Sequence, residues 1–134
     1  MQAEAELPRG RDAPSFARRA LERWYGGHLD AEELSDAKLL ASELVSNAVI
    51  HGNGQIRLRA NSDEDHLVIE VLDEGSGFEH TARRAPFDEV RGRGLAIVDA
   101  VSSRWGIHEG TTHVWAEIER QGPRLGRHKK PDVG

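Results

Sequence analysis

The chain has 134 residues with 37% hydrophobic and 31% charged side chains, a composition typical of one ordinary globular domain. Its formal charge of −5 disfavours nonspecific binding to nucleic acid, and no apolar run approaches the roughly 20 residues that span a bilayer. The lack of cysteine and of metal-binding histidine spacings argues against disulfides and a zinc site. Because no apolar run spans a bilayer and the acidic, polar start does not resemble a signal peptide, we expect a cytoplasmic protein without membrane or nucleic-acid contacts.

The N-terminal segment predicts a strand followed by a helix. Residues 4–7 fit a short edge strand, and Asp12 fits the N-cap of a helix that reaches Trp24 or Tyr25. Gly26 ends this helix. Its apolar side consists of Phe16, Ala17, Ala20, Leu21 and Trp24.

A second, longer helix is predicted to continue to His51. Asp30 and Glu33 have the spacing of a capping box at its start, and Gly52 suits the left-handed position that ends it. Its apolar face consists of Ala37, Ala41, Leu44, Val45 and Ala48.

Two polar residues lie beside this apolar face. Glu43 and Asn47 are four residues apart, which places them about 40° apart around the helix axis. Leu40 and Leu44 flank them, and a carboxylate in such a place is costly unless a charged or hydrogen-bonding partner meets it. Taken alone, the pair is more often structural than functional.

Two strands follow, at residues 55–60 and 66–73, with a turn between them. Period-2 geometry aims the carboxylate of Asp73 at the apolar layer, because Asp73 is next in the core-facing row of the second strand. That row consists of Leu67, Ile69 and Val71.

The remaining residues predict a loop, a third helix and two more strands. Residues 74–93 have no clear period and are interpreted as a mobile loop. Residues 94–105 predict a helix ended by Gly106, and strands are expected at 107–109 and 113–119. The inward residues of that helix are Ile97, Val98, Val101 and Trp105.

These elements predict an α/β (α+β) two-layer sandwich, with an antiparallel or mixed, mainly antiparallel sheet covered by helices on one face. We expect a single domain over residues 1–120. Residues 121–134 combine Arg and Lys with Gly and Pro and predict a disordered basic tail.

A D-x-G-x-G segment begins at Asp73. Gly75 and Gly77 lack side chains and leave room for a planar ligand against the backbone. The Asp73 carboxylate can accept a hydrogen bond from an exocyclic amine such as that of adenine. By itself, such a segment is most often only a turn.

A second glycine-containing segment, Arg91-Gly92-Arg93-Gly94-Leu95, opens the third helix. Its glycines expose N–H groups beside the positive end of the helix dipole, which is a ready anion site. Arg91 and Arg93 either add charge for a terminal phosphate or are ordinary solvated arginines.

The patterns occur in the order E-x-x-x-N-x-x-x-H on a helix, D-x-G-x-G after a strand and G-x-G-L at a helix start. The segments ELVSNAVIHG, DEGSGF and GRGLAIVDAVSSRWGI resemble the Bergerat-fold (GHKL) ATP-binding proteins, over residues 4–119. Within that family, they look most like the small anti-sigma-factor serine/threonine kinases of bacteria.

The resemblance implies a Bergerat ATP-binding fold and a role for each matching residue. Asn47 would be the side-chain ligand of Mg²⁺, Glu43 the general base, and Asp73 the acceptor for the adenine amine. The full set implied for nucleotide binding is Asn47, Asp73, Gly75, Gly77, Arg91, Gly92, Arg93, Gly94, Leu95 and Thr112.

One position departs from the family pattern. The family usually has a threonine just before its final strand, where it supports the adenine site. Here one alignment puts His113 at that position, and Thr111 and Thr112 are the other candidates.

The resemblance implies a kinase that uses Mg·ATP to phosphorylate an anti-sigma-factor antagonist of the STAS type and/or sequesters a sigma factor, and it suggests a homodimer. Intact Glu43 and Asn47 favour this interpretation, because a pure scaffold needs no base. The alternative is a non-catalytic, ATP-dependent interaction switch in which nucleotide orders residues 74–93. A histidine-kinase catalytic domain is disfavoured, because no dimerisation helix with a phosphoacceptor histidine precedes the motifs.

Overall fold

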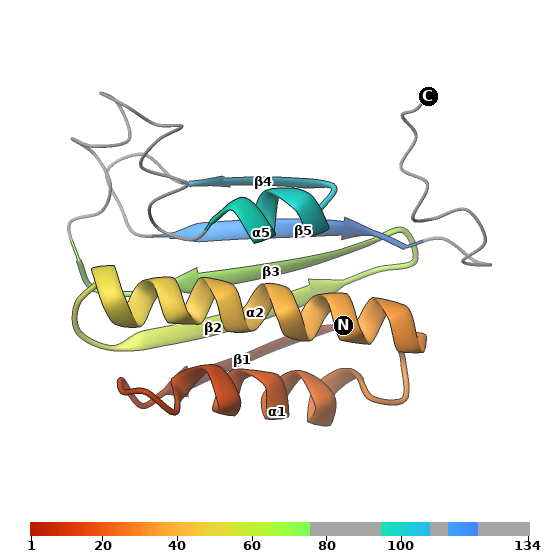
Figure 1. The fold of residues 1–134 in the computed structure, drawn as a ribbon. Helices are drawn as coiled ribbons and strands as arrows, with labels where there is room; N and C mark the ends of the chain where they lie inside the picture. The colour runs from red at the N-terminus through yellow and green to blue at the C-terminus, as the bar shows by residue number, and fades with distance from the viewer. Residues whose placement is uncertain (76–94, 108–112, 121–134) are drawn as a thin grey trace.

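An antiparallel sheet with helices on one face forms the described part of the chain, as predicted (Figure 1). The computed structural model describes residues 1–75, 95–107 and 113–120. The elements are β1 (Gln2–Leu7), α1 (Ala13–Tyr25), α2 (Ala31–His51), β2 (Ile56–Ser62), β3 (His66–Leu72), α5 (Leu95–Val101), β4 (Arg104–Ile107) and β5 (Val114–Glu119).

The strand order is β1-β2-β3-β5-β4, and each of these pairings is antiparallel. The N-terminal strand is therefore an edge strand, as the sequence predicted, and it begins at Gln2 rather than at residue 4. None of the helices in the described residues is long and apolar enough to cross a membrane.

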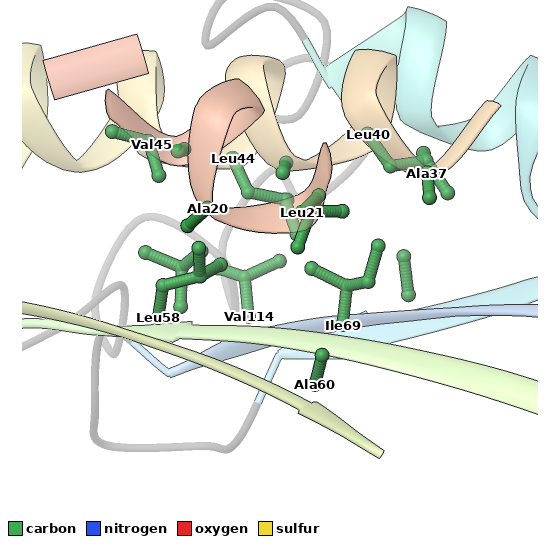
Figure 2. Close-up of a cluster of buried hydrophobic side chains, with 14 of the residues drawn as sticks. Ala20, Leu21, Ala37, Leu40, Leu44, Val45, Leu58, Ala60, Ile69 and Val114 are labelled. Atoms are coloured by element: carbon green, nitrogen blue, oxygen red, sulfur yellow. The ribbon is translucent and has the colours of Figure 1, made fainter. Parts of the chain in front are cut away.

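The core lies between the sheet and the helices, with α2 between α1 and α5 (Figure 1). Figure 2 shows Leu21 of α1 and Leu44 of α2 above Leu58 of β2, and each of the three is at most 1% exposed. The alternation predicted for the two strands is present, because every second residue is buried from Ile56 to Ala60 in β2 and from Leu67 to Val71 in β3.

The helix starts differ in how well the sequence predicted them. At α2 the capping box is present, with Glu33 N donating to Asp30 Oδ1 at 2.8 Å and Asp30 N donating to Glu33 Oε1 at 3.1 Å. At α1, Asp12 is the N-cap residue, as predicted, but its backbone angles are helical and its side chain makes no cap bond. Phe16 was also expected inward, but it is 40% exposed.

The helix α2 ends at His51, as predicted, but the conformation of the next residue differs from the prediction. Gly52 is extended, with φ −94° and ψ −160°, and is not in the left-handed region. Among the described residues, the positive φ of 67° falls at Gly54. The chain therefore leaves the helix in an extended conformation and turns two residues later.

The third helix is shorter than predicted. It ends at Val101, and the chain enters the sheet where Ser103 N donates to Glu117 O at 2.7 Å. Trp105 therefore lies in β4, opposite Ala116 of β5, and not in the helix. Trp105 packs against the core from the strand. Its apolar character therefore could not distinguish the periodicity of a helix from that of a strand. Ile97 was expected inward and is 42% exposed.

Candidate functional site

A small cavity lies where the C-terminal part of α2 meets the end of β3, and these two ends lie at the same end of the sandwich (Figure 1). The helix contributes mostly polar and small residues to its lining, and the strands contribute two valines, Val71 of β3 and Val114 of β5. The cavity is lined by Leu44, Asn47, Ala48, His51, Gly52, Val71, Asp73 and Val114. Two of the predicted site residues, Asn47 and Asp73, are therefore brought to one cavity.

Asn47 is 4% exposed and carries a buried side-chain oxygen. Within residues 1–75, 95–107 and 113–120, this Oδ1 has no hydrogen-bond partner. Leaving a buried acceptor without a partner costs about 1–3 kcal/mol, so such an atom is a natural point of attachment for a ligand. An amide oxygen is also among the ligands that hard cations such as Mg²⁺ accept.

Asp73 directly follows β3 and continues its inward-facing row, as the alternation predicted. Its Oδ2 is buried, and its Oδ1 accepts a hydrogen bond from Gly75 N at 2.7 Å. This bond to the residue two positions on forms an Asx turn, which fixes the orientation of the carboxylate. The D-x-G segment therefore serves as a turn and also directs an acceptor into the cavity.

Gly52 is a site residue whose role sequence reasoning missed. A Cβ atom added there would overlap Oδ2 of Asp73, so the helix end and the carboxylate are in direct van der Waals contact. The sequence offered His51-Gly52 only as a helix end. The role of Gly52 depends on the approach of Asp73, which no local pattern encodes.

The loop after Gly52 is tied to the Asp73 turn by backbone and packing contacts. Glu74 N donates to Asn53 O at 2.8 Å, and a Cβ at Gly54 would lie 2.7 Å from the Cβ of Glu74. The helix end and the D-x-G turn therefore form one unit, although they are distant in sequence.

We expect Gly52→Ala to lower the free energy of unfolding by about 1–3 kcal/mol, because the new methyl group must displace the Asp73 carboxylate. Urea unfolding measures this change. Gly27→Ala is the matched control, since a Cβ at Gly27 meets no atom within 4 Å. Equal stability of the two variants would show that Asp73 moves away from Gly52 without cost.

Glu43 lies on α2 one turn before Asn47 and is partly exposed. It is not among the residues that line the cavity in the described structure. A partly exposed carboxylate beside the cavity can reach a group that approaches from solvent, while Asn47 and Asp73 face inward.

The remaining predicted site residues fall in two groups. Gly77, Arg91, Gly92, Arg93, Gly94, Thr111 and Thr112 lie outside the described residues. Leu95 is the first residue of α5, and its side chain is fully buried in the core. Any ligand contact of Leu95 would therefore involve its backbone.

His113 lies on the side of the sheet that faces away from Asp73. Val71 and Val114 are paired and buried toward the helices, so Glu70 and His113, their chain neighbours, face the other side. There, His113 Nε2 lies 3.1 Å from Glu70 Oε2. His113 therefore does not extend its side chain toward the cavity.

Comparison with known proteins agrees with this architecture. The family model described as histidine kinase-like ATPase domain matches residues 8–118. The chain is similar to a protein named anti-sigma F factor from Lysinibacillus sphaericus, with 32% identity over 99 residues, 60% of this chain and 66% of the relative.

Two further relatives with the same name match shorter stretches. The protein from Clostridium acetobutylicum is 43% identical over 53 residues, 37% of each chain. The one from Thermoanaerobacter sp. is 39% identical over 71 residues, 48% of this chain and 49% of the relative. The matches thus cover between 37% and 66% of the length of these relatives. Because the family model covers most of the chain, the protein belongs to the histidine kinase-like ATPase domain family.

Proposed function

We propose that this protein is a serine/threonine protein kinase that binds ATP with Mg²⁺ in the cavity between α2 and β3. One observation carries the proposal: Asn47, whose buried Oδ1 has no hydrogen-bond partner in the described residues, and Asp73, whose Oδ2 is buried, line the same cavity. A cation suits the amide oxygen of Asn47 and an amine suits the carboxylate of Asp73, and Mg·ATP has both.

The residues present fit these two groups. Asn47 would hold Mg²⁺ as a single side-chain ligand, which suits an ion that takes its other ligands from phosphates and water. Within the described residues, no cluster of three or more His, Asp or Glu side chains offers an alternative metal site. Asp73 would accept from the adenine amine, and Gly52 keeps the space beside its carboxylate free of a side chain.

When bound, Mg·ATP supplies the transferable phosphoryl group and the positive charge that neutralises the phosphate oxygens. Glu43 would accept the proton of the attacking serine or threonine hydroxyl, whose oxygen forms a bond to the γ-phosphorus. The bond between that phosphorus and the bridging oxygen breaks, and ADP leaves. The partial exposure of Glu43, one turn from Asn47, supports this role.

The phosphate-binding part of the proposal rests on sequence motifs. Gly77, Arg91, Gly92, Arg93 and Gly94 would surround the nucleotide, with Gly75 and the backbone of Leu95. For the threonine beside adenine we propose Thr112, since His113 is engaged with Glu70 on the other side of the sheet.

The partners are proposed from the relatives. Three of them are named anti-sigma F factor, which supports a sigma factor as the protein that this chain sequesters. We propose an anti-sigma-factor antagonist of the STAS type as the substrate, a homodimer as the assembly and the cytoplasm as the location.

Incubating the purified protein with γ-labelled ATP, Mg²⁺ and candidate antagonist proteins tests the function. We expect label on a serine or threonine of a cognate antagonist. An antagonist that binds only in the presence of ATP and never takes up label would show an ATP-dependent switch in place of a kinase.

A further inference from the structure

Arg9 lies in the connection between β1 and α1, outside every segment that suggested a nucleotide site. Its guanidinium nevertheless reaches the end of α2 and the loop after it. Nη2 donates to Ala48 O at 2.9 Å, Nη1 donates to Val49 O at 2.8 Å, and Nε donates to Gly54 O at 2.8 Å. One side chain therefore joins three backbone carbonyls at the rim of the cavity.

The conformation of the helix end explains why such a side chain is needed. The last carbonyls of an α-helix have no partners within the helix, and a left-handed glycine cap usually satisfies some of them. Gly52 is extended, so that cap is absent from α2. Ala48 O accepts from Gly52 N at 2.9 Å, and Arg9 adds a second hydrogen bond to Ala48 O and one to Val49 O. A guanidinium offers five donors in a fixed plane and adds positive charge at the negative end of the helix dipole.

The three carbonyls belong to the segment that contacts the Asp73 turn. Ala48 and Gly52 line the cavity, Gly52 lies against Asp73 Oδ2, and Asn53 O accepts from Glu74 N. Holding Ala48, Val49 and Gly54 in place therefore fixes the backbone that packs against the Asp73 carboxylate.

We infer that Arg9 is a positioning residue for the nucleotide site: it fixes the end of α2 and residues 52–54 so that the Asp73 carboxylate keeps its orientation. This inference rests on the proposed function, because Asp73 is taken to bind adenine. Arg9 acts through the backbone and Asp73, and it is not proposed to touch the ligand.

The test compares Arg9→Ala and Arg9→Lys with Arg11→Ala in the full chain. Arg11 is exposed in the same connection and makes no hydrogen bond or ion pair within the described residues, which makes it a matched control. We expect Arg9→Ala to weaken Mg·ATP binding about tenfold in calorimetry, as loss of supporting contacts typically does. Arg9→Lys should restore part of the affinity, and Arg11→Ala should bind like the unmutated protein.

Two further measurements separate positioning from general stabilisation. Without nucleotide, Arg9→Ala should speed hydrogen exchange at the amides of Gly52 and Glu74, while the capping-box amide of Glu33 at the other end of α2 exchanges as before. In a double-mutant cycle with Asp73→Asn, the two affinity losses should combine to less than their product, because Arg9 acts through Asp73.

Several results would overturn the inference. Arg9 is a structural residue only if Arg9→Ala binds Mg·ATP with unchanged affinity. The same conclusion follows if the fold losses in affinity of Arg9→Ala and Asp73→Asn multiply in the double mutant. If Arg9→Ala does not fold, the inference is also overturned when Arg9→Lys has the same affinity for Mg·ATP and the same hydrogen-exchange rates as the unmutated protein. If the unmutated protein binds no nucleotide, the proposed function fails as well, and that control distinguishes the two failures.

Discussion

Glu43→Ala is expected to lower phosphoryl transfer to an antagonist by about 10²- to 10⁴-fold, the usual contribution of a general base. Affinity for Mg·ATP should remain near that of the unmutated protein, because Glu43 is partly exposed and is not among the residues lining the cavity of the described structure. Initial rates of label transfer and calorimetry with Mg·ATP measure the two quantities separately.

Glu64→Ala is a suitable control, since Glu64 is an exposed carboxylate in the turn between β2 and β3. It should leave both transfer and binding unchanged. Transfer by Glu43→Ala at the unmutated rate would mean that Glu43 is not the base. Unfolding of Glu43→Ala would mean that it is the structural carboxylate considered for the isolated motif.

Asp73→Asn is expected to weaken ATP binding by about 10- to 100-fold, the range expected when a hydrogen bond to a charged group is lost. The substitution is nearly isosteric. The asparagine oxygen can still accept from Gly75 N, so the turn is preserved, while the buried Oδ2 is replaced by a donor that cannot accept from the adenine amine. Calorimetric titration measures the loss.

Inosine triphosphate provides a sharper version of this test, because its base carries a carbonyl where adenine carries the amine. The unmutated protein should prefer ATP, and Asp73→Asn should narrow or reverse that preference. Arg57→Ala is the control, since Arg57 pairs with Glu4 and Glu6 on β1, away from the cavity. Equal discrimination by Asp73→Asn and the unmutated protein would mean that Asp73 does not contact the base.

The hydrophobic periodicity and the helix-capping residues correctly predicted those elements whose structure is set by neighbouring residues in the sequence. The alternation of apolar residues in β3 predicts that Asp73 faces the helices, and its carboxylate does line the cavity beneath α2. Asp30 and Glu33 predicted the start of α2, because the capping box is formed by residues three apart.

The sequence predicted that α2 ends at His51, but not the extended conformation of Gly52, because that conformation is set by residues far away in the chain. Gly52 is extended where it packs against Asp73, and the last-turn carbonyls of Ala48 and Val49 accept hydrogen bonds from Arg9, about forty residues earlier. A local signal for a glycine cap was present, and tertiary contacts overrode it.

The boundary of α5 was missed for a different reason. Trp105 meets the core in either a helix or a strand, so its hydrophobicity supported a helix that in fact ends at Val101. Pairing of Ser103 and Trp105 with β5 decides the outcome, and this pairing depends on residues later in the chain.

Calorimetric titration of the unmutated protein with ATP, in the presence and absence of Mg²⁺, most directly tests whether the cavity between α2 and β3 is a nucleotide site. We expect saturable binding that weakens when Mg²⁺ is removed, because Asn47 Oδ1 then lacks the cation. Lack of detectable binding at millimolar Mg·ATP would contradict the assignment of this cavity.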